Sequence, residues 1–138
     1  MNTSIAYFLL AMVAGVFCRE FTKFNHFTGE TVLGMTHAHL LMLGTFLFLG
    51  IDVLFHFTHL EENALYQKFY LIYNIALPLM VATMITRGIV QVLQPALSTW
   101  MDVAISGVAG LSHIGIFIAL LLLLVAIRLE LLTSEAAR

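Results

Sequence analysis

Charge and cysteine are both scarce in this sequence. Charged residues make up 10% of the 138 residues, the formal net charge is −2, and Cys18 is the single cysteine. One cysteine excludes an intrachain disulfide and any metal site built from several cysteines. A net charge this small gives no reason to expect a nucleic-acid partner. The chemistry must therefore be sought in the few polar groups that the chain does carry.

Apolar residues dominate what remains. They make up 61% of the chain, and the mean hydropathy is +0.99. A soluble domain of this size cannot bury so much apolar surface, because its surface is too large for its volume. The composition therefore predicts an integral membrane protein in contact with the lipid bilayer, with residues 1–138 forming one transmembrane domain.

Four long apolar runs define the predicted fold. Residues 31–51 contain no Lys, Arg, Asp or Glu, which is about the length that an α-helix needs to cross ~30 Å of hydrocarbon. Short connections between such helices force an up-down-up-down order. We predict an all-α four-helix bundle that crosses the membrane four times, at about residues 3–19, 31–53, 67–93 and 99–128. Basic residues lie on both sides of the predicted membrane spans and so favour neither orientation strongly; we take cytoplasmic termini as the working hypothesis.

Three histidines lie inside these spans. His37 and His39 fall near the start of the second span, and His113 lies near the middle of the fourth. Ionisable groups at membrane depth are costly unless they face the bundle interior and find a partner. Residues two apart in a helix differ by ~200° around its axis, so His37 and His39 must face different neighbours. A purely structural role for three such histidines on two helices is the weaker interpretation.

The third span contributes polar groups at helical spacing. Tyr73, Arg87 and Gln91 lie along it, and Arg87 is deep enough in the span to need an anion. Glu20 and Glu30 are on the correct side to supply one, and a carboxylate of a ligand could do the same. Tyr73 is a candidate contact of a cofactor, although an interhelical hydrogen bond is the simpler role for it.

Several stretches carry a resemblance to known families. FCREFTKFNHFTGET, THAHLLMLG, LIYNIALPLM, TRGIVQVL and ISGVAGLSHIG resemble a family of small bacterial four-span membrane proteins of unknown function, over almost the whole chain. HAHLLMLG is also similar to the haem-ligating region of haem–copper oxidase subunit I, and to the nitric-oxide-response haem–copper membrane protein family. The resemblance implies a bacterial inner membrane location and the following functional set: Arg19, Glu20, His37, His39, Arg87, Gln91 and His113.

The chain departs from the oxidases in one respect. It has no His-His pair and no tyrosine-linked histidine to hold a copper ion opposite a haem. We therefore do not expect oxygen reduction, and any enzymatic activity is left open. The leading hypothesis is a membrane protein that binds haem b for electron transfer with an unknown redox partner, or for sensing nitric oxide or oxygen. His39 and His113 would be the axial ligands, with His37 a further candidate, and Arg19 and Arg87 would neutralise the propionates.

Two other interpretations remain. Histidines together with Met35, Met42, Met80 and Met84 would also suit a copper or zinc site for transport or storage. A structural or assembly protein is the third interpretation. Four helices around a planar cofactor cannot also shield glycine-rich and phenylalanine-rich stripes on every side, so we expect self-association, as a homotrimer or a homodimer.

Overall fold

The computed structural model of the chain describes residues 1–94 and 98–136, and it is all-helical over this range, as the sequence predicts. Four helical rods account for nearly all of it. The first is α1 (Asn2–Phe24), the third is α4 (Ala64–Leu93) and the fourth is α5 (Thr99–Ala136). Helices α1, α4 and α5 each extend beyond the predicted spans, because the helices continue into the polar segments that follow or precede the apolar runs.

The second rod, called helix two below, consists of three consecutive segments. They are α2 (Leu33–His39), a π-helical segment η1 (Leu40–Phe46) and α3 (Leu47–Leu54). A short 3₁₀ turn, η2 (Leu60–Glu62), precedes α4. The sequence predicts one uninterrupted helix here, whereas the structure has a wide turn in its middle, directly after His39.

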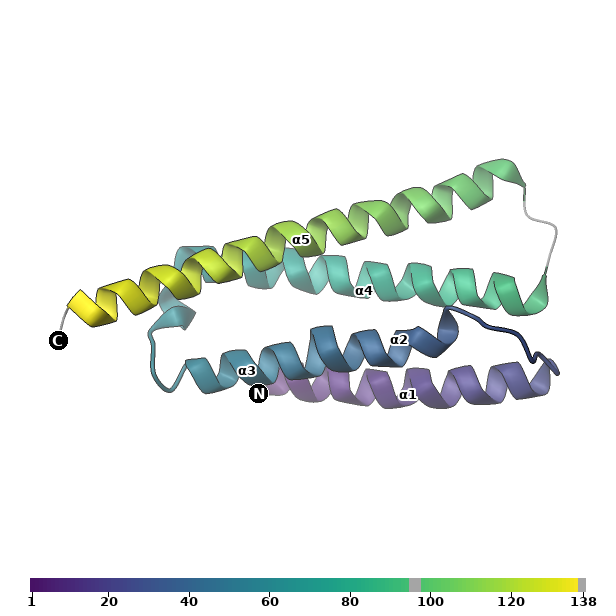
Figure 1. The fold of residues 1–138 in the computed structure, drawn as a ribbon, viewed down its shortest axis with the longest axis horizontal. Helices are drawn as coiled ribbons and strands as arrows, with labels where there is room; N and C mark the ends of the chain where they lie inside the picture. The colour runs from purple at the N-terminus through teal and green to yellow at the C-terminus, as the bar shows by residue number, and fades with distance from the viewer. Residues whose placement is uncertain (95–97, 137–138) are drawn as a thin grey trace.

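The four rods do not all pack on one another, and the bundle is less tightly packed between α5 and helix two. Helix two packs on α1 and on α4, and α5 packs along α4. Figure 1 shows α5 diverging from α4 toward the end where the two helices are joined. Among the described residues, α5 and helix two are not packed along one another. The first half of helix two and the first half of α5 therefore lie on either side of α4 without packing closely on one another.

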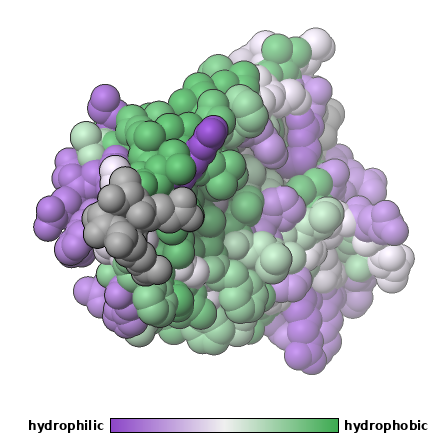
Figure 2. Space-filling view, turned by 60° about the vertical axis from the view of Figure 1, so that its left-hand side comes forward, coloured by the Kyte–Doolittle hydropathy of each residue, from purple (hydrophilic) through white to green (hydrophobic). Residues whose placement is uncertain are grey.

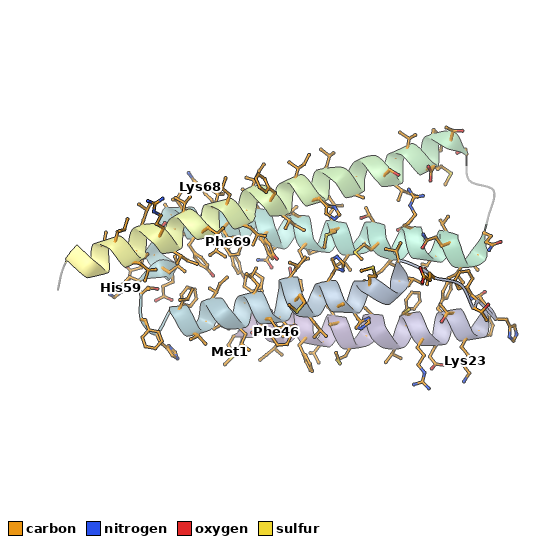
Figure 3. All side chains as sticks on the ribbon, viewed as in Figure 1. Met1, Lys23, Phe46, His59, Lys68 and Phe69 are labelled. Atoms are coloured by element: carbon orange, nitrogen blue, oxygen red, sulfur yellow. The ribbon has the colours of Figure 1, made fainter. Side chains whose placement is uncertain are left out.

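Aromatic rings form the centre of the bundle. Phe48 of α3 stacks on Tyr7 of α1 with ring centroids 5.7 Å apart, and it meets Tyr73 of α4 edge-on at 5.8 Å. Phe69, labelled in Figure 3, is fully buried beside Tyr73. Such offset and edge-to-face pairs are favourable aromatic contacts. This cluster joins α1, helix two and α4 into one unit, to which α5 adds from one side.

The outer surface is largely apolar. Figure 2 shows hydrophobic side chains across the middle of the visible face and hydrophilic side chains toward its left and right edges. Exposed large apolar residues occur on all four rods, and each rod is long and apolar enough to cross a membrane. The chain is a multi-pass membrane protein in contact with the bilayer.

The antiparallel order makes a testable prediction about sidedness. Figure 3 places Lys23 at one end of the bundle and Lys68 at the other, and Trp100 lies in the first turn of α5, at the same end as Lys23 (Figure 1). In a Cys18→Ala background, we expect cysteines at positions 23 and 100 to react alike with an impermeant reagent on intact cells, and a cysteine at position 68 to react oppositely. Opposite labelling of positions 23 and 100 would contradict the four-span arrangement.

Candidate cofactor site

A cavity of about 520 Å³ lies between helix two, α4 and α5. It brings together three of the residues that the sequence singles out, His39, Arg87 and His113. The remaining lining residues are mostly apolar or small: Val32, Met35, Thr83, Met84, Ile105, Ser106 and Ala109. A mostly apolar cavity with a few convergent polar groups is the usual form of a small-molecule or cofactor site. It lies beside the first half of α5, the half that diverges from α4 (Figure 1).

The two cavity histidines have the same local geometry. The Nδ1 atom of His39 lies 2.9 Å from the carbonyl oxygen of Met35, and that of His113 lies 2.7 Å from the carbonyl oxygen of Ala109. A carbonyl oxygen can only accept, so Nδ1 carries the hydrogen and donates it in both rings. This leaves the lone pair on Nε2, which is the form in which imidazole binds a metal.

Arg87 finds its anion in a place that the sequence interpretation missed. Its guanidinium forms an ion pair with Asp102, in the first turn of α5, and donates to Ser106 Oγ at 2.6 Å. The expectation that Glu20 or Glu30 would pair with Arg87 is therefore wrong. The reason is that α5 runs antiparallel to α4, so its first turns lie beside the last turns of α4, where Arg87 is located. In the sequence, this ion pair could have been inferred from Asp102, an acidic residue in the first turn of the fourth span.

Arg19 and Glu20 do not line the cavity. They are neighbours at the end of α1, where Arg19 Nε lies 3.7 Å from Glu20 Oε1, with side chains 79% and 58% exposed. Glu20 instead borders a second, exposed hollow together with Lys23, Phe24 and His26. A pair this exposed contributes little to stability. Of the two arginines expected at a bound carboxylate, Arg87 alone borders the His39–His113 cavity within the described residues.

Gln91 does not line the cavity but forms hydrogen bonds with the start of helix two. Its Oε1 accepts a hydrogen bond from the backbone nitrogen of Val32 at 2.9 Å and lies 3.2 Å from the hydroxyl of Thr31. The N–H of Val32 is one of the backbone donors that a helix start leaves without an intrahelical partner. Gln91 lies one turn beyond Arg87 in α4, so it fixes α2 against α4 close to the cavity.

His37 faces the opposite side of helix two, as the 200° separation predicts. Its Cβ lies 3.7 Å from the position that a Cβ would take at Gly15 of α1. Its Nδ1 is buried and has no hydrogen-bond partner among the described residues. The structure thus separates His37 from the pair formed by His39 and His113.

Tyr73 also lies away from the cavity. It is fully buried in α4, and its hydroxyl donates to the carbonyl oxygen of Leu43, in η1, at 2.8 Å. This is the interhelical hydrogen bond that the sequence offered as its simpler role. The segment that receives it begins one residue after His39.

Methionines are the second donor type at this site. Met35 and Met84 both line the cavity with His39 and His113, whereas Met42 and Met80 do not border it. Among the side chains that the structure describes, no group of three or more His, Cys, Asp or Glu residues could hold a metal ion. The cavity thus offers two imidazoles and two thioethers as possible ligands.

Comparison with known proteins identifies a family. The family model described as "Protein of unknown function (DUF2871)" matches residues 1–130. No curated protein and no solved structure matches the chain significantly. The likeness of helix two to the haem–copper oxidases thus stays a resemblance of one short motif.

Proposed function

This chain belongs to the DUF2871 family of proteins of unknown function, and we propose that it is a membrane haem b protein of the bacterial inner membrane. The iron would be held between His39 of helix two and His113 of α5. The observation that carries the proposal is the shared cavity, in which both rings keep Nε2 free because Nδ1 donates to a carbonyl of the same helix.

The donor set suits haem iron. Neutral imidazole is a common axial ligand, and two histidines from facing helices are a familiar arrangement in helix bundles. The hydrogen bond at each Nδ1 orients the ring and raises the basicity of the ligand. A volume of about 520 Å³ is within the range of cofactor sites, and on α5 the lining includes the small side chains of Ser106 and Ala109. These features support a flat, largely apolar ligand.

Arg87 supports the polar end of such a ligand. One terminal nitrogen of its guanidinium pairs with Asp102 and the other donates to Ser106, but the group has five N–H donors. Those not used by α5 can face a carboxylate in the cavity. Asp102 would then share Arg87 with the acidic groups of the ligand and hold the guanidinium in place.

His39 and His113 would both bind the haem. A bound haem would supply one-electron chemistry, and two histidine ligands from the protein favour electron transfer over direct binding of nitric oxide or oxygen. Electron transfer is therefore the favoured form of the proposal, ahead of sensing of either gas.

Copper is the second candidate, because Met35 and Met84 border the same cavity as the two histidines. Thioether and imidazole ligands together select Cu(I), whereas thioethers are not typical ligands of zinc. The cavity can be tested by titrating protein purified without haem with hemin and, separately, with Cu(I). We expect one hemin per chain, with a sharp Soret band, and no tight Cu(I) binding. Tight binding of one Cu(I) and loose, non-saturating hemin would favour the copper site instead.

We also propose that the chain self-associates, as a homotrimer or a homodimer. His113 is exposed at membrane depth in the single chain, and exposed apolar residues such as Phe117 and Ile114 continue the same side of α5. Polar groups at this depth usually face protein. Light scattering in mild detergent is expected to give a mass of two or three chains. A monomer, with or without bound haem, would contradict this proposal without affecting the first one.

A further inference from the structure

The wide turn of helix two begins directly after the cavity histidine. Segment η1 covers Leu40–Phe46, and His39 is the last residue of α2. In a π-helix each N–H bonds to the carbonyl five residues back, which widens the turn. Such segments are rare, and they occur frequently at functional sites.

The wide turn changes the direction in which His39 points. The buried positions around it, Thr36, Leu40, Gly44 and Phe48, are spaced four residues apart and all face the core. An unbroken α-helix turns by ~100° per residue, so these positions would drift by about 120° around the axis from first to last. If Phe48 kept its place in the aromatic core, an α-helical helix two would rotate His39 away from its present direction. The π-helical turn therefore allows His39 to line the cavity while Phe48 stays in the aromatic core.

Two tyrosines from neighbouring helices hold this turn. Tyr73 of α4 donates its hydroxyl hydrogen to the carbonyl oxygen of Leu43 at 2.8 Å. From α1, the ring of Tyr7 packs against Gly44 so closely that a Cβ there would lie 2.6 Å from Tyr7 Cβ. The Tyr7 hydroxyl in turn donates to Asn74 Oδ1 at 2.9 Å. The tyrosines reach the wide turn from two sides, and Tyr73 does so by bonding to its backbone.

We infer that Tyr73 is a positioning residue for His39. Its hydroxyl stabilises the π-helical register of helix two, and this register points His39 into the cavity shared with His113. Without the hydroxyl, the Leu43 carbonyl loses a partner in a dry core, where an unpaired carbonyl is costly. Helix two can then also adopt an ordinary α-helical register, in which its backbone groups pair more regularly, and the two registers are both populated. The significance of His39 rests on the proposed function, whereas the effect of Tyr73 on the register does not.

The register can be measured without any cofactor. In a Cys18→Ala background, spin labels are attached at Ala38→Cys of α2 and Leu111→Cys of α5, both exposed positions, and their distance is recorded. A second pair joins Leu49→Cys, which lies in α3 beyond the wide turn, to the same Leu111→Cys position. In Tyr73→Phe, we expect a second population for the first pair, shifted by about 5 Å or more, since a rotation of ~100° moves a side chain across much of the ~10 Å helix diameter. The second pair should keep its distance.

Tyr66→Phe is the matched control. Tyr66 is also a buried tyrosine of α4, and within the described residues its hydroxyl makes no hydrogen bond to helix two. We expect both distances to be unchanged in this variant. If Tyr73→Phe left the first distance unchanged, or if Tyr66→Phe shifted it equally, the inference would be overturned.

A spectroscopic arm links the register to the cofactor. If the wild-type chain holds a six-coordinate haem, Tyr73→Phe should show a partly high-spin ferric signal, and Tyr66→Phe should not. A wild-type chain without haem would remove the proposed function, while the distance measurement would still decide the role of Tyr73. A wild-type haem spectrum in Tyr73→Phe together with an altered distance would show that Tyr73 sets the register but does not position a ligand, and would overturn the inference.

Discussion

Replacing His113 with alanine is expected to abolish the six-coordinate haem spectrum, and His39→Ala is expected to do the same. Each variant removes one of the two imidazoles that line the cavity, and no other imidazole borders that cavity in the described part of the chain. Haem content per chain and the spectrum after dithionite reduction measure the effect. We expect a loss of bound haem of at least tenfold, or its conversion to a high-spin form.

His37→Ala provides the matched control for these variants. It removes an imidazole from the same helix, two residues away, on the side that faces α1. The haem content and the position of the Soret band should remain close to those of the wild type. If His37→Ala lost the haem and His39→Ala retained it, the assignment of the ligand in helix two would be reversed. If all three variants kept a wild-type spectrum, the site would lie elsewhere.

The second large effect is expected at Gly88, in the contact between α4 and helix two. A Cβ at Gly88 would lie 2.8 Å from the backbone nitrogen of Leu33 and closer still to its side chain. Backbone atoms cannot rotate out of the way, so Gly88→Ala must push the start of helix two off α4. This shift would also weaken the hydrogen bond from Val32 to Gln91. We expect a loss of about 1–3 kcal/mol in the free energy of unfolding, as for other overpacked contacts.

Gly107→Ala is the control for Gly88→Ala. Gly107 lies in α5 and has no atom within 4 Å of the place that a Cβ would take. Alanine is the better helix former, by up to about 1 kcal/mol, so this variant should be neutral or slightly more stable. Thermal unfolding in detergent, followed by circular dichroism, compares the two. Equal stability of Gly88→Ala and Gly107→Ala would contradict the close packing of α4 on helix two.

The sequence was sufficient to predict the all-helical fold with four membrane-spanning helices, and it singled out histidines that the structure can now locate. Long runs without charge define membrane helices, because uncompensated charge is costly in hydrocarbon, and short connections fix their order. The helical period separates His37 from His39, and depth in the membrane selects His113. The structure then places His39 and His113 at one cavity, with Arg87 beside them.

Details that depend on the relative placement of two helices could not be predicted from the sequence. Asp102, in the first turn of the fourth span, was a sign of its pairing with Arg87, but the sequence does not show which faces of α4 and α5 meet. The π-helical turn is equally hidden, since Leu40–Phe46 has the composition of any apolar helix. The contacts made to it by Tyr7 at Gly44 and by Tyr73 at Leu43 join residues more than 25 positions apart in the sequence.

The absorption spectrum of the protein purified from its own membranes tests the central claim most directly. Spectra would be recorded as isolated and after reduction with dithionite, and the haem and metal content per chain would be determined on the same sample. A haem b held by His39 and His113 predicts one haem per chain, and a Soret band that shifts and sharpens on reduction together with narrow α and β bands. A colourless protein that carries one copper ion per chain, or no cofactor at all, would contradict the haem proposal.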